Sequence, residues 1–184
     1  MHVFLFVPNV IGYVRLLFLC MAVFYFESYY FKVFYGLNFV LDGIDGTAAR
    51  YFNQCTRFGY ALDMILDRIG STLLFIKLSH LHLKELWILC MFLDISSHWF
   101  ATLSSSETHK KPRNQILKLY YDNLLLVCLC SEGFLMLMID AQLNNSALHW
   151  ALYFALGVAF MFKQIVNVKQ LQVSALDLSK KPSF

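Results

Sequence analysis

The chain carries four aspartates inside stretches of otherwise apolar sequence. Asp42 and Asp45 lie in one stretch, and Asp63 and Asp67 lie in the next. An ionised carboxylate near the centre of a bilayer costs roughly 2.5–3.5 kcal/mol, so four would cost on the order of 10 kcal/mol without compensation. A membrane chain that keeps such residues is expected to bind cations with them and to do chemistry there.

The spacing of the aspartates places them on two helical faces. Asp42 and Asp45 fall on one face by the i, i+3, i+4, i+7 rule, and Gly59, Asp63 and Asp67 form a second row at i, i+4, i+8. A short polar connection joins the two segments, which predicts antiparallel neighbouring helices whose carboxylates meet. Glycine and alanine residues on the same faces would let helices or a ligand approach closely.

Carboxylates gathered in this way repel one another unless cations lie between them. Hard divalent ions such as Mg²⁺ prefer oxygen ligands and keep positions open for substrate phosphates. Two such ions about 3.5–4 Å apart can clamp a pyrophosphate and stabilise charge on a departing phosphate. Arg50 and Arg57 lie beside the cluster and could bind phosphate oxygens or balance charge. A single aspartate can serve as a structural hydrogen-bond partner and a flanking arginine as a topology signal, but this reading explains the complete array poorly.

The composition predicts an all-α membrane protein. Of the 184 residues, 59% are hydrophobic and only 15% are charged, whereas a soluble domain carries about a quarter charged residues. The apolar residues come in long blocks, so we expect a polytopic membrane helix bundle that forms a single domain over residues 1–184. At ~20 residues for each span, roughly six transmembrane helices are predicted, over residues 4–26, 31–49, 58–79, 83–103, 116–139 and 147–168.

The basic residues argue for a membrane topology and against a nucleic-acid partner. The net charge is only +3, and the basic residues lie at segment ends rather than on one continuous face. They gather after the second segment, after the fourth and at the C-terminal end, which predicts that these places and both termini face the cytosol. The residues concerned are Arg50, Arg57, Lys110, Lys111, Arg113, Lys118, Lys163, Lys169, Lys180 and Lys181.

The two aspartate segments together resemble the signature of the CDP-alcohol phosphatidyltransferase family. The sequence reads D-x-x-D-G-x-x-A-R from Asp42 to Arg50, then eight residues, then G-x-x-x-D-x-x-x-D from Gly59 to Asp67. Every specified position of the signature is present.

This resemblance implies a metal-dependent transferase that acts on CDP-diacylglycerol in the lipid bilayer. The family's two divalent ions, Mg²⁺ or Mn²⁺, would be held by the four aspartates of the signature: Asp42, Asp45, Asp63 and Asp67. Asp67 would also act as the general base, and the donor would contact Gly46, Arg50 and Thr56. The hydroxyl of an acceptor alcohol would attack the phosphorus attached to the lipid, and CMP would leave.

Further strings indicate which acceptor the chain uses. Val7-Pro8-Asn9, Thr56-Arg57-Phe58-Gly59 and the stretch 93–99 resemble the members of the family that use inositol. They imply transfer of the phosphatidyl group to myo-inositol, giving phosphatidylinositol, in the endoplasmic reticulum or Golgi membrane, and they are compatible with a homodimer. Two alternatives stay open: a family member with another acceptor, such as serine or glycerol phosphate, and a cation transporter that uses the carboxylates as an ion pathway.

A few polar residues outside the signature could have either a functional or a structural role. Asn9 and Arg15 resemble positions that face the nucleotide site in the family, but each could equally bond to a neighbouring helix. Asp94 and His98 are i, i+4 neighbours that could contact inositol, although a buried polar pair is the expected role. Asn144 begins a glycosylation sequon in a short loop close to the membrane, where we do not expect modification.

Overall fold

A computed structural model describes residues 2–81, 83–104, 115–144 and 150–180 of the chain, and the part described is helical. The chain divides into two compact units, Met1–Leu73 and Leu74–Phe184. The first contains a short 3₁₀ helix η1 (Val3–Leu5), α1 (Val7–Phe24), α2 (Tyr30–Tyr51) and most of α3 (Arg57–Leu81). The second contains the end of α3, followed by α4 (Lys84–Ser104), α5 (Gln115–Asp122), α6 (Leu124–Asn144) and α7 (Trp150–Ser179).

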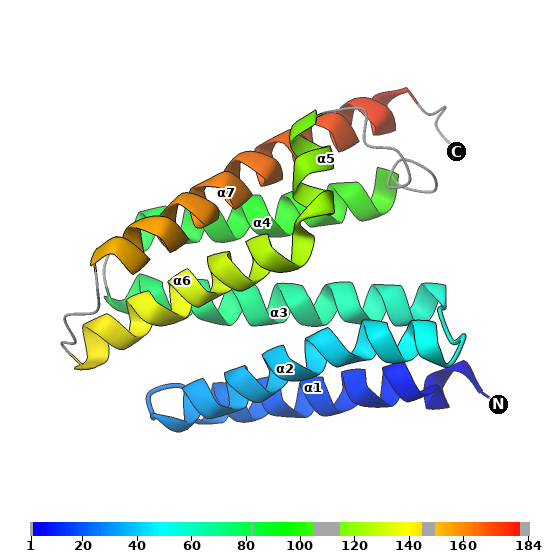
Figure 1. The fold of residues 1–184 in the computed structure, drawn as a ribbon, viewed down its shortest axis with the longest axis horizontal. Helices are drawn as coiled ribbons and strands as arrows, with labels where there is room; N and C mark the ends of the chain where they lie inside the picture. The colour runs from blue at the N-terminus through cyan, green and yellow to red at the C-terminus, as the bar shows by residue number, and fades with distance from the viewer. Residues whose placement is uncertain (1, 82, 105–114, 145–149, 181–184) are drawn as a thin grey trace. The chain divides into compact units, whose positions relative to one another are not determined.

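In the first unit, α1 and α2 form an antiparallel hairpin (Figure 1). Pro8 lies in the first turn of α1, where its missing N–H costs no hydrogen bond. Aromatic rings close the turn between the helices, with Tyr25 against Tyr30 at 5.6 Å between ring centroids. Leu19 and Phe31 are buried in the interface. A Cβ added to Gly70 of α3 would come within 4 Å of side chains from both α1 and α2, so α3 packs closely on the hairpin.

The connection from α2 to α3 is a tight turn with a defined geometry. The Gln54 N–H donates to the Ala49 carbonyl at 2.9 Å, and the Asn53 N–H donates to the Arg50 carbonyl at 3.3 Å. This is the pattern of a Schellman C-cap, and Asn53 takes the left-handed conformation that the motif requires, with φ 54°. Thr56 precedes α3, and its hydroxyl accepts the Gly59 N–H at 3.0 Å as an N-cap. Both ends of the turn are therefore fixed by hydrogen bonds.

In the second unit, α7 contacts α4, α5 and α6. Its apolar core includes the rings of Phe75, Trp87 and Phe160 together with a cluster around Val166. A polar layer crosses the α4–α7 interface. The Asn167 amide donates to the Asp94 carboxylate at 3.2 Å, and both side chains are about 1% exposed. Buried polar groups in an apolar bundle need such partners.

The all-α membrane bundle predicted from the sequence is confirmed. Two of the described helices, α1 and α4, are long and apolar enough to cross a membrane by length and composition alone. Large apolar side chains also lie exposed on the helices, such as Leu17, Leu89 and Phe154, and lipid would cover these surfaces. The single domain over residues 1–184 stays a prediction.

The predicted helix boundaries need two corrections. The fifth span, expected over residues 116–139, is divided at Asn123 into α5 and α6. The Asn123 amide donates to the Leu119 carbonyl at 3.0 Å, and such local bonds compete with the helical pattern. The last span, expected over 147–168, is α7 and continues to Ser179. The sequon residues Asn145 and Ser146 and the basic residues 110, 111, 113 and 181 lie outside the described part of the chain.

Candidate metal centre and donor pocket

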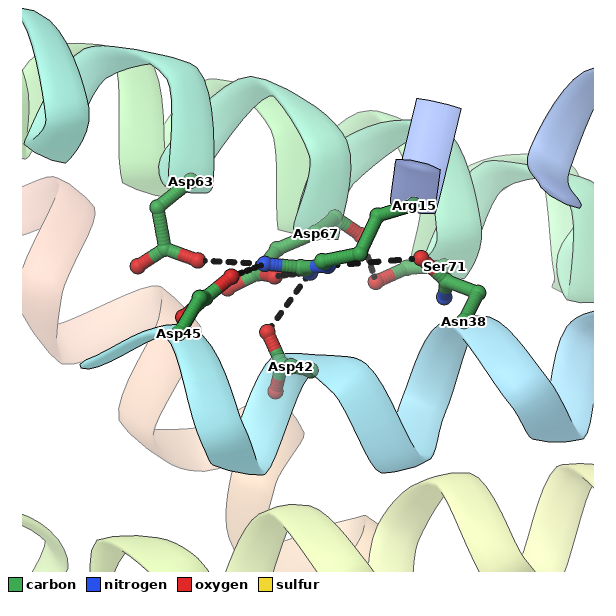
Figure 2. A network of polar contacts seen from close by, with 7 residues as sticks. All are labelled: Arg15, Asn38, Asp42, Asp45, Asp63, Asp67 and Ser71. Carbon is green, nitrogen blue, oxygen red and sulfur yellow. Dashed lines mark hydrogen bonds and ion pairs between the residues drawn. The ribbon is translucent and has the colours of Figure 1, made fainter. Parts of the chain in front are cut away.

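The first unit brings all four predicted aspartates to one place. Asp42 and Asp45 come from consecutive turns of α2, and Asp63 and Asp67 come from consecutive turns of α3. Figure 2 shows their carboxylates pointing toward one another from the two helices. The convergence that the helical spacing predicted is therefore present.

A buried arginine of α1 lies at the centre of this group. The Arg15 side chain is 1% exposed and forms ion pairs with all four carboxylates, at 2.6 Å to Asp42, 2.5 Å to Asp45, 2.8 Å to Asp63 and 2.7 Å to Asp67. Its planar guanidinium carries five N–H donors, so one side chain can serve several acceptors at once.

Two further polar side chains, one from α2 and one from α3, make hydrogen bonds to residues of the cluster. The Arg15 Nε donates to the Asn38 side-chain oxygen at 3.4 Å. The Ser71 hydroxyl donates to the backbone carbonyl of Asp67 at 2.8 Å. Asp45 is the most deeply buried carboxylate, while Asp42 and Asp63 keep 38% and 45% of their side chains exposed. The centre is thus shielded from the surroundings at Asp45 and accessible at the other three carboxylates.

The carboxylates fit a divalent cation. Asp42, Asp63 and Asp67 each offer an oxygen, and these three oxygens lie within 4.8 Å of one another. Carboxylate oxygens are the ligands that Mg²⁺ and Mn²⁺ favour. The same group already holds a positive charge, because Arg15 is bound there.

A cavity of about 240 Å³ adjoins the centre. Its lining includes two of the carboxylates, Asp45 and Asp63, and all three residues predicted to contact the donor, Gly46, Arg50 and Thr56. The other lining residues are Pro8, Asn9, Gly12, Ala49, Gln54, Cys55, Gly59, Tyr60 and Leu62. The cavity therefore joins the signature residues of α2 and α3 to the beginning of α1.

The predicted donor residues have local roles as well. The Arg50 guanidinium donates to the Thr47 hydroxyl at 3.3 Å. A Cβ added at Gly46 would lie 3.5 Å from the Arg50 guanidinium, which is ordinary contact. Thr56 caps α3, as described above. Of these three residues, Thr56 is the one whose side chain caps a helix.

The sequence did not place Arg15 among the carboxylates, and it assigned no role to Asn38 or to Gln54. An arginine inside an apolar span is itself a signal, because an uncompensated charge there is costly. Gln54 accepts the Val7 N–H at 2.8 Å and so ties the α2–α3 turn to the start of α1. Asp94 and His98 belong to the second unit, where Asp94 bonds to Asn167 and the His98 ring lies 2.8 Å from the Asp94 carbonyl.

Comparison with known proteins gives consistent results. A family model described as CDP-alcohol phosphatidyltransferase matches residues 5–162. The CDP-diacylglycerol–inositol 3-phosphatidyltransferase of Candida albicans is 37% identical, over 97% of this chain and 84% of the relative. An enzyme of the same name from Arabidopsis thaliana is 32% identical, over 95% of this chain and 89% of the relative. The Homo sapiens enzyme is 37% identical over 74% and 71% of the two chains. No solved structure matches.

Proposed function

Since this chain belongs to the CDP-alcohol phosphatidyltransferase family, we propose that it transfers the phosphatidyl group of CDP-diacylglycerol to myo-inositol, releasing CMP. The observation that carries the proposal is the convergence of four carboxylates beside a cavity lined by the predicted donor residues. The relatives named above support inositol as the acceptor, because their names state that substrate.

Two divalent ions, Mg²⁺ or Mn²⁺, are proposed to bind between Asp42, Asp45, Asp63 and Asp67. The candidate ligands support this proposal, because they are all carboxylates and three of their oxygens lie within 4.8 Å of one another. When bound, the ions would offset the charge of the pyrophosphate and the charge that develops on CMP.

The donor's cytidine diphosphate part is proposed to occupy the cavity beside the carboxylates. Gly46 presents no side chain toward the cavity, so a nucleotide can approach the α2 backbone there. The Arg50 guanidinium is suited to bind phosphate oxygens with two donors at once. The Thr56 hydroxyl can accept or donate a hydrogen bond beside the same cavity. Holding a lipid-anchored phosphate and a soluble alcohol in one place lowers the entropic part of the barrier.

Asp67 is proposed as the general base. An inositol hydroxyl attacks the phosphorus attached to the diacylglycerol, and its proton passes to the Asp67 carboxylate. A new phosphorus–oxygen bond forms to inositol, and the bond from that phosphorus to the bridging oxygen breaks, so CMP leaves with the oxygen and its electron pair. About a third of the Asp67 side chain is exposed, which supports access for a soluble alcohol.

The membrane setting is part of the proposal. The chain is placed in the endoplasmic reticulum or Golgi membrane with the metal centre and both termini toward the cytosol. Arg50 and Arg57 beside the centre support that orientation by the positive-inside rule. A single domain over residues 1–184 and a homodimer complete the proposal.

Purified protein tests the reaction and its acceptor. CDP-diacylglycerol is offered with labelled inositol, serine or glycerol phosphate in parallel, and CMP release is measured with Mg²⁺ or Mn²⁺. We expect CMP and labelled lipid with inositol alone. Product with serine or glycerol phosphate instead would reassign the acceptor. Cation flux into vesicles without any CMP release would favour a transporter.

Asp67→Asn tests the base. General-base catalysis contributes about 10²–10⁴-fold, so turnover should fall by at least about a hundredfold while binding of CDP-diacylglycerol is largely kept. Turnover close to that of the unaltered enzyme would refute the assignment.

A further inference from the structure

Arg15 is the feature of the first unit that the proposed reaction does not use. Its guanidinium is the one positively charged group among the carboxylates in Figure 2, and it contacts each of them at 2.5 to 2.8 Å. The four carboxylates carry a formal charge of −4, and Arg15 leaves −3 (−4 + 1). Without Arg15, four like charges would lie together in an apolar bundle and would lose the one cationic side chain that, among the described residues, is bound to all of them.

The contacts of Arg15 overlap with the ligands of the proposed ions. Asp42, Asp63 and Asp67, which are the three residues able to share an ion, are each bound by the guanidinium through one oxygen. A divalent ion among these oxygens would therefore lie close to a fixed positive charge. The two cations would repel each other, and most strongly on the side of the buried Arg15 side chain, which is 1% exposed.

We propose that Arg15 is a resident counter-ion that keeps the four carboxylates convergent when no metal is bound and competes with the metal ions for them. Arg15 is a positioning residue in this role, because it acts through the carboxylates and not on the substrate. Its charge lowers the affinity for divalent ions, and its contacts to Asp42, Asp63 and Asp67 weaken as an ion binds. The inference rests on the proposed metal site.

The buried environment of Arg15 supports a positioning role. The side chain is 1% exposed, and the Asn38 side-chain oxygen accepts a hydrogen bond from its Nε–H, so the inner nitrogen of the guanidinium is held by α2 as well. An arginine present only as a topology signal would lie at a helix end in contact with water or headgroups. Arg15 lies well inside α1, which runs from Val7 to Phe24.

Binding of Mn²⁺ to purified protein tests the proposal without any substrate. The EPR signal of free Mn²⁺ in solution reports the bound fraction and gives a Kd. Arg15→Gln removes the charge with a side chain of similar reach, and we expect its Kd for Mn²⁺ to be at least tenfold lower than that of the unaltered protein. Lys84→Gln, which removes one exposed positive charge in the second unit, is the matched control and should leave the Kd unchanged.

Arg15→Lys provides a second variant in case Arg15→Gln does not fold. Its ammonium is a point charge that cannot contact four carboxylates at once, so we expect a Kd between those of the unaltered protein and Arg15→Gln, at least threefold below the former. The thermal stability of both variants without metal should fall, and added Mn²⁺ should raise it by more than in the unaltered protein, because the ion then supplies the missing charge.

The outcomes separate the two proposals. An unaltered protein that binds no Mn²⁺ would overturn the metal site. Binding to the unaltered protein with an equal or higher Kd in both Arg15 variants would overturn the competition and leave the metal site standing. A decrease of the same size in Lys84→Gln would also overturn it, because the effect would then be one of overall charge.

Discussion

Substituting Gly59 with alanine adds one methyl group where the cavity beside the carboxylates meets the start of α1. The new Cβ would lie 3.0 Å from the Asn9 side-chain oxygen and 3.2 Å from the Thr56 hydroxyl. Neither neighbour moves freely. Asn9 is 1% exposed and donates to the Val3 carbonyl at 2.6 Å, while Thr56 accepts the N–H of residue 59 itself.

Two opposing terms decide the effect of Gly59→Ala on stability. Overpacking of this kind costs about 1–3 kcal/mol, and alanine gains about 1 kcal/mol over glycine inside a helix. The net loss should be about 1 kcal/mol. Because the methyl group also displaces two cavity-lining side chains, the KM for CDP-diacylglycerol should rise about tenfold, which corresponds to about 1.4 kcal/mol.

The assay is CMP release by purified enzyme over a range of CDP-diacylglycerol concentrations, together with a thermal unfolding curve. Gly36→Ala is the matched control, because a Cβ added at Gly36 of α2 has no neighbour within 4 Å. It should leave the KM unchanged and keep or raise the Tm. If Gly59→Ala matches Gly36→Ala in both KM and Tm, the close contact with Asn9 and Thr56 does not constrain this enzyme.

Three other substitutions test separate parts of the structure. Thr56→Ala removes the cap of α3 and should cost about 0.5–2 kcal/mol of stability, whereas Thr56→Ser keeps the hydroxyl and should restore most of it in the same unfolding experiment. Arg50→Lys keeps the charge but loses the paired donors, so the KM for the donor should rise severalfold with little change in the stability of the protein; an unchanged KM would remove Arg50 from the donor site. Asn167→Leu deletes a buried donor to Asp94 and should lower stability by about 1–3 kcal/mol, and Asp94→Asn in the same background should recover part of that loss if the lost hydrogen bond to the buried carboxylate is the cause.

The sequence was sufficient to predict the convergence of the aspartates, because helical periodicity and a short connection are local properties. Asp42 and Asp45 had to share a face, and a turn of a few residues had to return the chain beside it. Arg15 could not be placed in this way. Its position among the carboxylates depends on how α1 packs on α2 and α3, and periodicity within α1 does not determine that packing.

The same limit explains the corrections in the second unit. The break at Asn123 coincides with a side-chain bond to the Leu119 carbonyl, which hydropathy does not report. The bond between Asp94 and Asn167 joins residues 73 positions apart, so only the packing of α4 on α7 reveals it. Apolar segments predicted the helices, while the partners of their buried polar residues required the tertiary structure.

The capped turn between α2 and α3 has a consequence for how the family signature can vary in length. The two halves of the signature lie on α2 and α3. The Schellman cap at Asn53 and the N-cap at Thr56 fix the rotation of one helix relative to the other. One residue inserted into α3 between the Thr56 cap and Asp63 would rotate Asp63 and Asp67 by about 100° around the helix axis and carry them away from their partners on α2, and one inserted into the turn would break the hydrogen bonds of its caps. Insertions and deletions should therefore be absent between Arg50 and Gly59 in active relatives, even where the intervening residue types differ.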